Sequence, residues 1–364
     1  MGLKQFFESS VTKIRLLGRV FGAKKSNKQH FKALKQHNIP IKKLTRSQKR
    51  EIDAIFKIKR GKRRYKYSYA THQLYLSVTG KFDARIIPED LFRIYIEPQM
   101  NEITHRKVFA NKAYFDKMLP SANLPKTVVR NFGGIFFDSN YNFITYEQAT
   151  EIVNGYSELV YKKAIETGSG RGVHLVDLKN ENPLVESNKN YLLQEKIIQH
   201  PDLSKLNESS VNIVRVMTWF NGKEVVALSP ALRVGGKGFF TDNSTTSDGM
   251  GMTVTGLTND GVCSDLSFYS CGIKAKVSAS GVELNSYKIP QVDKMIEEAK
   301  KQHLQLLPNI DFVGWDFTVD DKNNVIIIEY NITCPGILYY QYVNGPLFAD
   351  KTDEFLNRYL GKKK

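Results

Sequence analysis

The sequence contains few cysteines and no long hydrophobic run, and each shortage excludes a class of protein. The three cysteines among 364 residues are irregularly spaced, which fits neither a disulfide framework nor a zinc site. Such cysteine usage is typical of a reducing, cytoplasmic setting. No stretch approaches roughly 18 uninterrupted apolar residues, so we expect no membrane-spanning helix. The Gly-Lys-Ser/Thr phosphate loop does not occur in the sequence either.

Acidic residues are almost missing from the first part of the chain. Residues 1–66 contain 21 lysines and arginines and 3 acidic residues, a net charge of +18. Residues 67–364 contain 32 lysines and arginines and 34 acidic residues, a net charge of −2. The two parts together give the net charge of +16 of the whole chain. The basic character therefore belongs to an N-terminal segment, and the rest is a nearly neutral globular body.

The basic segment has a helical pattern. Its apolar residues fall on one helical stripe and its basic residues mostly occupy the remainder, the apolar set being Leu3, Phe6, Phe7, Val11, Ile14, Leu17, Val20 and Phe21. This pattern predicts that residues 1–25 bind an anionic membrane surface, with the protein peripheral on the inner face. A helix packed on the body and a nucleic-acid patch are the alternatives, and no nucleic-acid-binding motif supports the second.

Beyond this segment the sequence predicts an α+β protein built on antiparallel sheets. A Ser/Thr start signal predicts a helix from Thr45, and further helices are expected near 111–120, 146–156 and 291–307. Strands are expected at residues 134–137, 159–163, 172–178, 191–197, 211–220 and 225–234, and in a closing hairpin.

That closing hairpin carries the strongest chemical signal. Apolar runs at 312–319 and 325–331 flank a five-residue turn cluster. If Asp320 pairs with Val325, then Asp316 lies opposite Glu329, and Asn331 points to the same side as Glu329. Two facing carboxylates repel unless a cation lies between them, and oxygen ligands suit Mg²⁺. The alternative is that Glu329 and Asn331 only form the solvent face of an edge strand.

A glycine-rich stretch, 168–172, follows two lysines at the end of an expected strand. Glycines allow a backbone to approach phosphates closely, and Lys163 would add a positive charge there. The stretch lies between two strands, whereas the glycines of a dinucleotide-binding motif lead into a helix. An ordinary flexible turn is the alternative.

Taken together, these motifs resemble the ATP-grasp superfamily over residues 105–345, and within it the sugar-transfer-associated ATP-grasp proteins of bacterial envelope polysaccharide loci. The resemblance is carried by ordered pieces: Asn111-Lys112, Lys163 with the glycine stretch, the strand 192–198, and Asp316 followed by Glu329-Tyr-Asn331. It implies two α+β subdomains that sandwich ATP. The regions would be a basic helical segment (1–65), a small α+β subdomain (66–108), the small ATP-grasp subdomain (109–200) and the catalytic subdomain (201–364).

The resemblance also implies roles for individual residues. One or two Mg²⁺ ions would be held by Asp316, Glu329 and Asn331. ATP would be bound by Lys112 and Lys163, by the loop Gly168, Ser169, Gly170, Arg171 and Gly172, and by the adenine hinge Glu195, Lys196 and Ile198. Arg215 and Arg233 would stabilise negative charge during catalysis, and a buried or surface ion pair is the alternative for each.

Two positions depart from the family pattern. Many ligases of the superfamily have an arginine where this chain has Gly314, so Arg233 is expected to stabilise the acyl phosphate instead. Tyr330 stands where the narrower family often has a small residue, which would crowd the metal site.

The implied activity is an ATP- and Mg²⁺-dependent carboxylate–amine (or carboxylate–hydroxyl) ligase that works through an acyl phosphate. Its substrate would be a sugar acid or amino acid component of envelope or capsule polysaccharide. A small-molecule kinase and a noncatalytic membrane-surface adaptor with a vestigial nucleotide site are the alternatives.

Overall fold

The computed structural model describes residues 3–60, 63–102, 106, 108–165, 170–185, 189–242, 249–333 and 335–361. The α-helices are α1 (Leu3–Gln36), α2 (Arg46–Phe56), α3 (Ala70–Thr79), α4 (Glu89–Leu91), α5 (Glu97–Met100), α7 (Phe115–Met118), α8 (Tyr146–Asn154), α9 (Pro201–Ser204), α10 (Val292–His303), α11 (Ile337–Asn344) and α12 (Thr352–Leu360). One π-helical turn, η1 (Phe92–Ile96), joins α4 to α5, and short 3-10 turns are η2 (Lys112–Tyr114), η3 (Pro183–Val185), η4 (Leu304–Leu306) and η5 (Ala349–Lys351).

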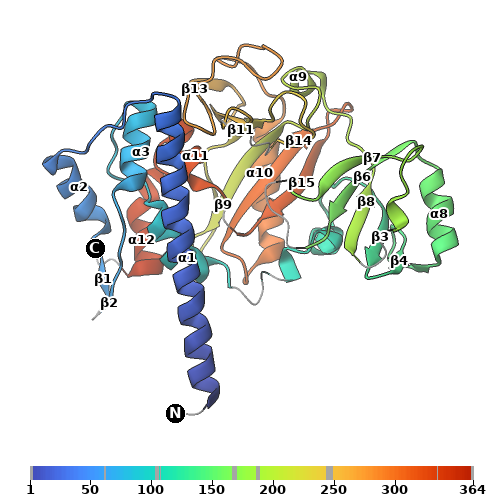
Figure 1. The fold of residues 1–364 in the computed structure, drawn as a ribbon, viewed down its shortest axis with the longest axis horizontal. Coiled ribbons are helices and arrows are strands. Elements are labelled where there is room, and N and C mark those ends of the chain that lie inside the picture. Colours follow the sequence, from blue (N-terminus) through green and yellow to red (C-terminus); the bar gives the residue numbers. More distant parts are fainter. Residues whose placement is uncertain are drawn as a thin grey trace.

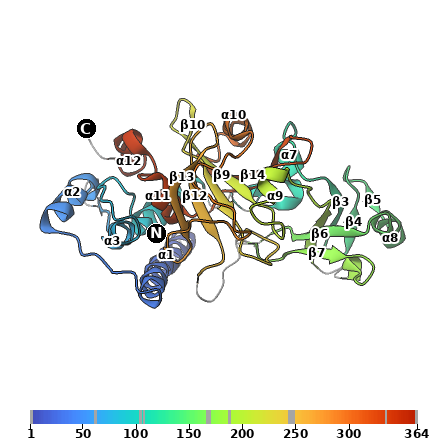
Figure 2. The same cartoon turned by 90° about the horizontal axis from the view of Figure 1, so that it is seen from above.

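Two antiparallel sheets form the centre of the fold, which confirms the α+β class. The six-stranded sheet has the order β5-β4-β3-β8-β6-β7 and contains β3 (Thr127–Phe132), β4 (Ile135–Phe137), β5 (Phe143–Ile144), β6 (Glu158–Lys163), β7 (Val173–Asp177) and β8 (Asn190–Gln194). The seven-stranded sheet has the order β13-β12-β11-β9-β14-β15, with β10 also on β9, and contains β9 (Ile213–Phe220), β10 (Val225–Ala227), β11 (Ala231–Val234), β12 (Thr253–Leu257), β13 (Cys263–Tyr269), β14 (Phe312–Val319) and β15 (Val325–Asn331). Figure 2 shows the smaller sheet, with α8 on its outer face, beside the larger one.

The N-terminal helices pack on the far side of the larger sheet (Figure 1). Helix α2 begins as predicted, because the Thr45 side chain accepts a hydrogen bond from the Gln48 backbone N–H and the Gln48 side chain accepts one from the Thr45 backbone N–H. Among the described residues of 66–108 the elements are the helices α3, α4, η1 and α5, where an α+β subdomain was expected. A short pair, β1 (Lys59–Arg60) with β2 (Arg63–Arg64), precedes them.

Helix α1 has two parts with different surroundings. Its C-terminal half packs against α3, α4 and η1, and Ala23 and Leu34 are buried. Its N-terminal half extends beyond the body as an isolated helix in Figure 1. Packing on the body, one of the alternatives for the basic segment, is therefore correct for the second half of α1. No helix in the described part of the chain is long and apolar enough to cross a membrane.

The N-terminal helices share a hydrophobic core with the end of the chain. This core brings residues such as Phe56 and Phe92 together with Phe312 of β14 and Phe355 of α12. Each of these side chains is at most 2% exposed, so the contact is extensive. Because burial of such side chains stabilises a fold by about 1.5–3 kcal/mol each, the N-terminal helices belong to the same folding unit as the larger sheet.

Candidate functional site

The β14–β15 hairpin places Asp316 directly opposite Glu329, as the sequence predicts. The assumed pairing at the turn is different, because Val319 rather than Asp320 pairs with Val325. A β-bulge after Asp316 inserts one extra residue on β15 and restores the opposition of the two carboxylates. Asp316 also pairs with Arg215 of β9, so it lies on an inner strand of the sheet, whereas Glu329 and Asn331 lie on the edge strand β15.

Each carboxylate of this pair has a cationic neighbour. Arg215 holds Asp316 through two hydrogen bonds, with 2.9 Å between Nη2 and Oδ2, and its Nη1 donates to the Pro335 carbonyl at 2.8 Å. The Lys112 Nζ lies 2.7 Å from a Glu329 oxygen. Burial alone would raise the pKa of Glu329, but Lys112 and the neighbouring cations lower it to about 2. The Glu329 carboxylate is therefore ionised at neutral pH.

Asn331 completes this group. Its amide nitrogen donates to Asp316 Oδ2 at 2.9 Å and lies 3.4 Å from Glu329 Oε1. The three side chains thus converge on one point, although no cluster of three His, Cys, Asp or Glu side chains in the described residues is arranged to hold a metal ion. Two carboxylates with one amide fit Mg²⁺, which keeps most of its positions for water and phosphate oxygens. Zinc and copper favour nitrogen and sulfur ligands, which this group lacks.

The two adjacent lysines of β6 lie on opposite faces of their strand. Lys162 points to the cleft beside Val160, and burial with the nearby Lys112 lowers its pKa to about 8. Lys163 is exposed and lies against Gly172, where an added Cβ would be 2.8 Å from its Cδ. Of the two lysines of β6, the one that lies beside Glu329 is therefore Lys162, whereas Lys163 was expected from the sequence.

Lys112 is anchored next to this strand. Its backbone N–H donates to the Ala164 carbonyl just after β6, at 2.9 Å, and the Asn111 side chain caps the turn through the Ala113 N–H. This places both lysines, 112 and 162, beside Glu329. Together they supply positive charge on the side of the acidic pair that faces the six-stranded sheet.

The glycine-rich stretch is partly described. Gly170 and Gly172 have positive φ values of 70° and 73°, which L side chains rarely adopt. An added Cβ at Gly170 would meet the Thr241 hydroxyl at 2.7 Å, so the loop closely approaches the segment that follows β11. Arg171, between them, lines a cavity at the site. Gly168 and Ser169 lie outside the described residues.

A cleft between the two sheets is lined by apolar and by charged side chains. Its apolar lining includes Val160, Val173, Ile213 and Ile328, and its charged lining includes Lys162, Asp316 and Glu329. This cleft is called the nucleotide cleft below, after the ligand that the sequence resemblance implies.

The expected hinge strand lines the nucleotide cleft with four of its residues, Gln194, Glu195, Lys196 and Ile197. Glu195 and Lys196 are at the wall, where Glu195 pairs with Lys126 at 2.6 Å and Lys196 with Glu158 at 2.9 Å. Ile197 lines the cleft, whereas the Ile198 side chain is 67% exposed. The two charged side chains therefore face partners at the rim, and Ile197 supplies the apolar surface.

A second cavity, of about 640 Å³, adjoins the acidic pair, and Glu329 lines both spaces. It is called the arginine cavity, because its charged lining consists of Arg93, Arg171, Arg215, Arg233, Lys112 and Glu329. Arg233 forms an ion pair with Asp242 at 2.8 Å. Burial raises the pKa of Asp242, Arg233 opposes this rise, and the nearby Asp316 adds to it. Both candidate catalytic arginines thus lie in buried ion pairs at the cavity wall.

The two departures from the family pattern have structural explanations. An ideal Cβ at Gly314 would lie 3.5 Å from Arg215 Cδ, so Arg215 occupies the space beside the position where many ligases have an arginine. Tyr330 does not crowd Glu329 and Asn331. Its ring stacks on Phe115 at 4.2 Å between centroids, and its hydroxyl donates to the Phe109 carbonyl.

Comparison with known proteins identifies the C-terminal half of the chain. Residues 182–355 match the family described as sugar-transfer associated ATP-grasp, which confirms the family expected from the sequence. No curated protein is similar enough to be counted as a match.

Several solved structures overlap partially with this one. They include the ATP-grasp ligase PsnB complexed with a phosphomimetic variant of minimal precursor, Mg and ADP, at 12% identity, covering 71% of this chain and 62% of that one, with a TM-score of 0.40. N5-carboxyaminoimidazole synthetase from Staphylococcus aureus complexed with ADP is 11% identical, and the match covers 73% of this chain and 55% of that one, with a TM-score of 0.40. VanG D-Ala:D-Ser ligase from Enterococcus faecalis is 13% identical, and the match covers 69% of this chain and 61% of that one, with a TM-score of 0.39. The chain spans less than two thirds of the length of each.

Proposed function

We propose that this chain, whose residues 182–355 belong to the sugar-transfer associated ATP-grasp family, is an ATP- and Mg²⁺-dependent ligase that joins a carboxylate to an amine or hydroxyl. The observation that carries the proposal is the convergence of Asp316, Glu329 and Asn331 at the junction of the nucleotide cleft and the arginine cavity. A metal held there would contact a nucleotide on one side and a second substrate on the other.

The charged residues divide the work of the reaction. Asp316, Glu329 and Asn331 would hold magnesium, which neutralises the phosphate oxygens of the nucleotide. Lys112 and Lys162 would bind the same phosphates, and Lys162 takes the role first assigned to Lys163. Gly170, Arg171 and Gly172 would cover the phosphates, while Glu195, Lys196 and Ile197 would line the adenine slot.

The chemistry takes place in two displacements. A substrate carboxylate oxygen attacks the terminal phosphorus and ADP leaves, which gives an acyl phosphate. The amine or hydroxyl then attacks the acyl carbon, its proton is lost, and inorganic phosphate leaves. Each attack builds negative charge on oxygen, which Arg215 and Arg233 would stabilise from the cavity wall. Arg215 is the better placed of the two for the phosphoryl end, because it lies beside Asp316.

The description of the matched family, which links it to sugar transfer, supports the proposed substrate class. A sugar acid or an amino acid component of envelope or capsule polysaccharide is the proposed substrate. The test is coupled detection of ADP from ATP with a panel of sugar acids and amines, together with hydroxylamine trapping. Hydroxamate formation supports a ligase, whereas a stable phosphorylated product without hydroxamate would identify a kinase, and no nucleotide consumption with any mixture would contradict the proposal.

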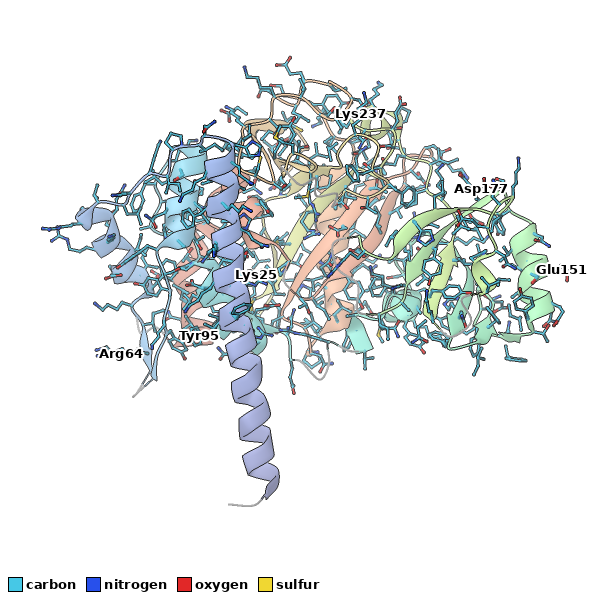
Figure 3. The ribbon with its side chains drawn as sticks, in the orientation of Figure 1. Lys25, Arg64, Tyr95, Glu151, Asp177 and Lys237 are labelled. Atoms are coloured by element: carbon cyan, nitrogen blue, oxygen red, sulfur yellow. The ribbon has the colours of Figure 1, made fainter. Side chains whose placement is uncertain are left out.

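We also propose that residues 1–25 bind an anionic membrane surface. The projecting half of α1 supports this, and so does the direction of the β1–β2 pair, where the labelled Arg64 points to the same side of the body as the free end of α1 in Figure 3. Lys57, Lys59, Arg64 and Lys66 around this pair are exposed. Basic side chains near an anionic leaflet contribute about 1 kcal/mol each, so two such elements would orient the body on the surface.

A further inference from the structure

Lys112 depends on its backbone for its place at the site. A lysine has a flexible four-carbon stem, so its ammonium group stays at one point only if the backbone beneath it is fixed. The Lys112 Nζ lies 2.7 Å from a Glu329 oxygen, and the side chain is 13% exposed. The residue belongs to a single 3-10 turn, η2, which is too short to be stable by itself. Contacts from other elements must therefore hold this turn.

The carbonyl of the next residue, Ala113, receives two hydrogen bonds from the six-stranded sheet. Arg130 of β3 donates to it from Nε at 3.1 Å, and the hydroxyl of Tyr141, in the turn between β4 and β5, lies 2.7 Å away. Before the turn, the Lys112 N–H donates to the Ala164 carbonyl at 2.9 Å. The backbone is thus held before Lys112 by the segment that follows β6, and after it by Arg130 and Tyr141.

Arg130 is built into the fold with almost no exposure. Its side chain is buried, and its guanidinium also donates to the carbonyls of Asp138 and Ser139 at 2.9 and 3.1 Å. Both Arg130 and Tyr141 bind the Asp116 carboxylate in α7. The guanidinium carbon lies 3.9 Å from the centroid of the Tyr141 ring, so the two side chains also contact each other. Arg130 therefore joins β3 to the η2–α7 segment and to the β4–β5 turn.

Tyr141 has an unusual backbone conformation. Its φ is +64°, in the left-handed region that side chains other than Asn and Asp rarely adopt. Such conformations occur frequently at functional sites. In this conformation the hydroxyl reaches both the Ala113 carbonyl and the Asp116 carboxylate. Burial, and then the hydrogen bond with Asp116, raise the pKa of Tyr141, so the hydroxyl keeps its proton at neutral pH and remains a donor.

We propose that Arg130 and Tyr141 are positioning residues, which hold Lys112 at the acidic pair through the Ala113 carbonyl. Neither is among the described residues that line the nucleotide cleft or the arginine cavity. Their effect on the ligand would therefore pass through Lys112. This inference rests on the proposed binding of nucleotide phosphates by Lys112.

The test is a double-mutant cycle on the full chain, measured by isothermal titration calorimetry with Mg²⁺ and a nonhydrolysable ATP analogue. The proteins are the wild type, Tyr141→Phe, Lys112→Gln and the double variant. Tyr141→Phe removes only the hydroxyl, and we expect it to bind the analogue at least fourfold more weakly than the wild type. In the Lys112→Gln background the same change should alter the affinity less than twofold, because no ammonium group remains to be positioned.

Tyr146→Phe is the matched control. Tyr146 begins α8, on the outer face of the same sheet in Figure 2, and its hydroxyl accepts a hydrogen bond from Asn182 at 3.1 Å. This variant should bind the analogue as the wild type does. Equal losses from Tyr141→Phe with and without Lys112, or no loss in Tyr141→Phe, would overturn the inference.

Arg130→Lys examines the same carbonyl from the other side. It keeps the charge and loses the forked geometry, so it should also weaken binding of the analogue, and only while Lys112 is present. A loss that is equal in the Lys112→Gln background would contradict a positioning role for Arg130. If Arg130→Lys does not fold, the cycle with Tyr141→Phe decides the result.

Failure of the ligase proposal gives a different result. If the analogue does not bind the wild type, the proposed function is wrong, and the position of Lys112 is measured without nucleotide. Labelling with acetic anhydride and mass spectrometry gives the reactivity of the Lys112 amine relative to that of Lys162, which general loosening would also expose. This ratio should be at least threefold higher in Tyr141→Phe than in the wild type, because the amine loses its contact with Glu329. An unchanged ratio would overturn the inference.

Discussion

Lys162 and Lys163 are adjacent in β6, yet only Lys162 lies in the cleft beside Glu329, while Lys163 lies against Gly172 on the other face. Two neighbouring lysines with opposite orientations provide a matched pair of variants. They carry the same charge and belong to the same strand. A difference in nucleotide affinity between the two variants would therefore result from the position of the side chain alone.

Lys162→Gln should weaken binding of a nonhydrolysable ATP analogue at least tenfold, because it removes a positive charge from the phosphate end of the cleft. Lys163→Gln should change the affinity less than twofold. Isothermal titration calorimetry with Mg²⁺ measures both. Equal losses in the two variants would show that general charge, not the position in the cleft, attracts the nucleotide.

Glu329→Gln should abolish ATP turnover and leave the fold intact, because it removes one charged oxygen ligand while keeping the shape of the side chain. In the wild type, Mg²⁺ should increase the melting-temperature rise caused by the ATP analogue, and this increase should be lost in the variant. A collapsed far-UV circular dichroism spectrum would instead show that Glu329 is needed for folding.

Arg215→Met should destabilise the protein by about 3–5 kcal/mol, because it leaves the buried Asp316 without its cationic partner. Arg215→Met combined with Asp316→Asn should be less destabilised than Arg215→Met alone. Urea denaturation of the wild type, Arg215→Met, Asp316→Asn and the double variant measures the coupling between the two residues. Additive losses would contradict a direct interaction.

Stability should fall as the pH decreases from 7 to 5. Burial lowers the pKa values of His72 and His303 to about 4, although carbonyl hydrogen bonds oppose the shift. Their ordinary value is about 6.5, so the unfolded chain binds more protons between pH 6.5 and 4, and stability is lost in that window. Each histidine should contribute roughly 2 kcal/mol to the loss by pH 5. Urea denaturation of the wild type and of His303→Gln at pH 7 and pH 5 measures this. The free energy of unfolding should fall less between the two pH values in the variant than in the wild type.

Deletion of residues 1–17 should release the protein from anionic phospholipid vesicles without unfolding it. The deletion spares Arg19 and the buried Ala23, which hold the second half of α1 on the body. Sedimentation with vesicles that contain phosphatidylserine, and with neutral vesicles as the control, measures the effect. Unchanged binding to the anionic vesicles would exclude the projecting half of α1 as the contact.

The sequence predicted most of the site because the hairpin carries strong local signals. Strand composition on both sides of a turn cluster located β14 and β15, and period-two alternation placed Glu329 and Asn331 together. The exact pairing at the turn was not predictable, since a β-bulge depends on contacts with β9 as well as on local sequence. Asp316 still lies opposite Glu329, because the bulge compensates for the shifted turn.

The orientation of Lys162 was not predictable from β6 itself. Leu159, Val160 and Tyr161 are three consecutive buried residues, so the strand shows no alternation that would reveal which lysine faces the cleft. Strand β12 was missed for a related reason: all five of its residues are buried, and Gly256 interrupts its strand-like composition. Arg93 had no sequence signal, because its place at the cavity depends on packing between distant helices.

The pairing of Lys112 with Glu329, and of Arg215 with Asp316, has a consequence for the order of events. Magnesium arriving without nucleotide would have to displace these cations and would leave Lys112 without an anion. A triphosphate that arrived with the metal would give Lys112 a new partner through its oxygens, and Glu329 would be released to hold the ion. Partner exchange of this kind makes entry of the two ligands concerted, so the free metal should have little affinity for the protein.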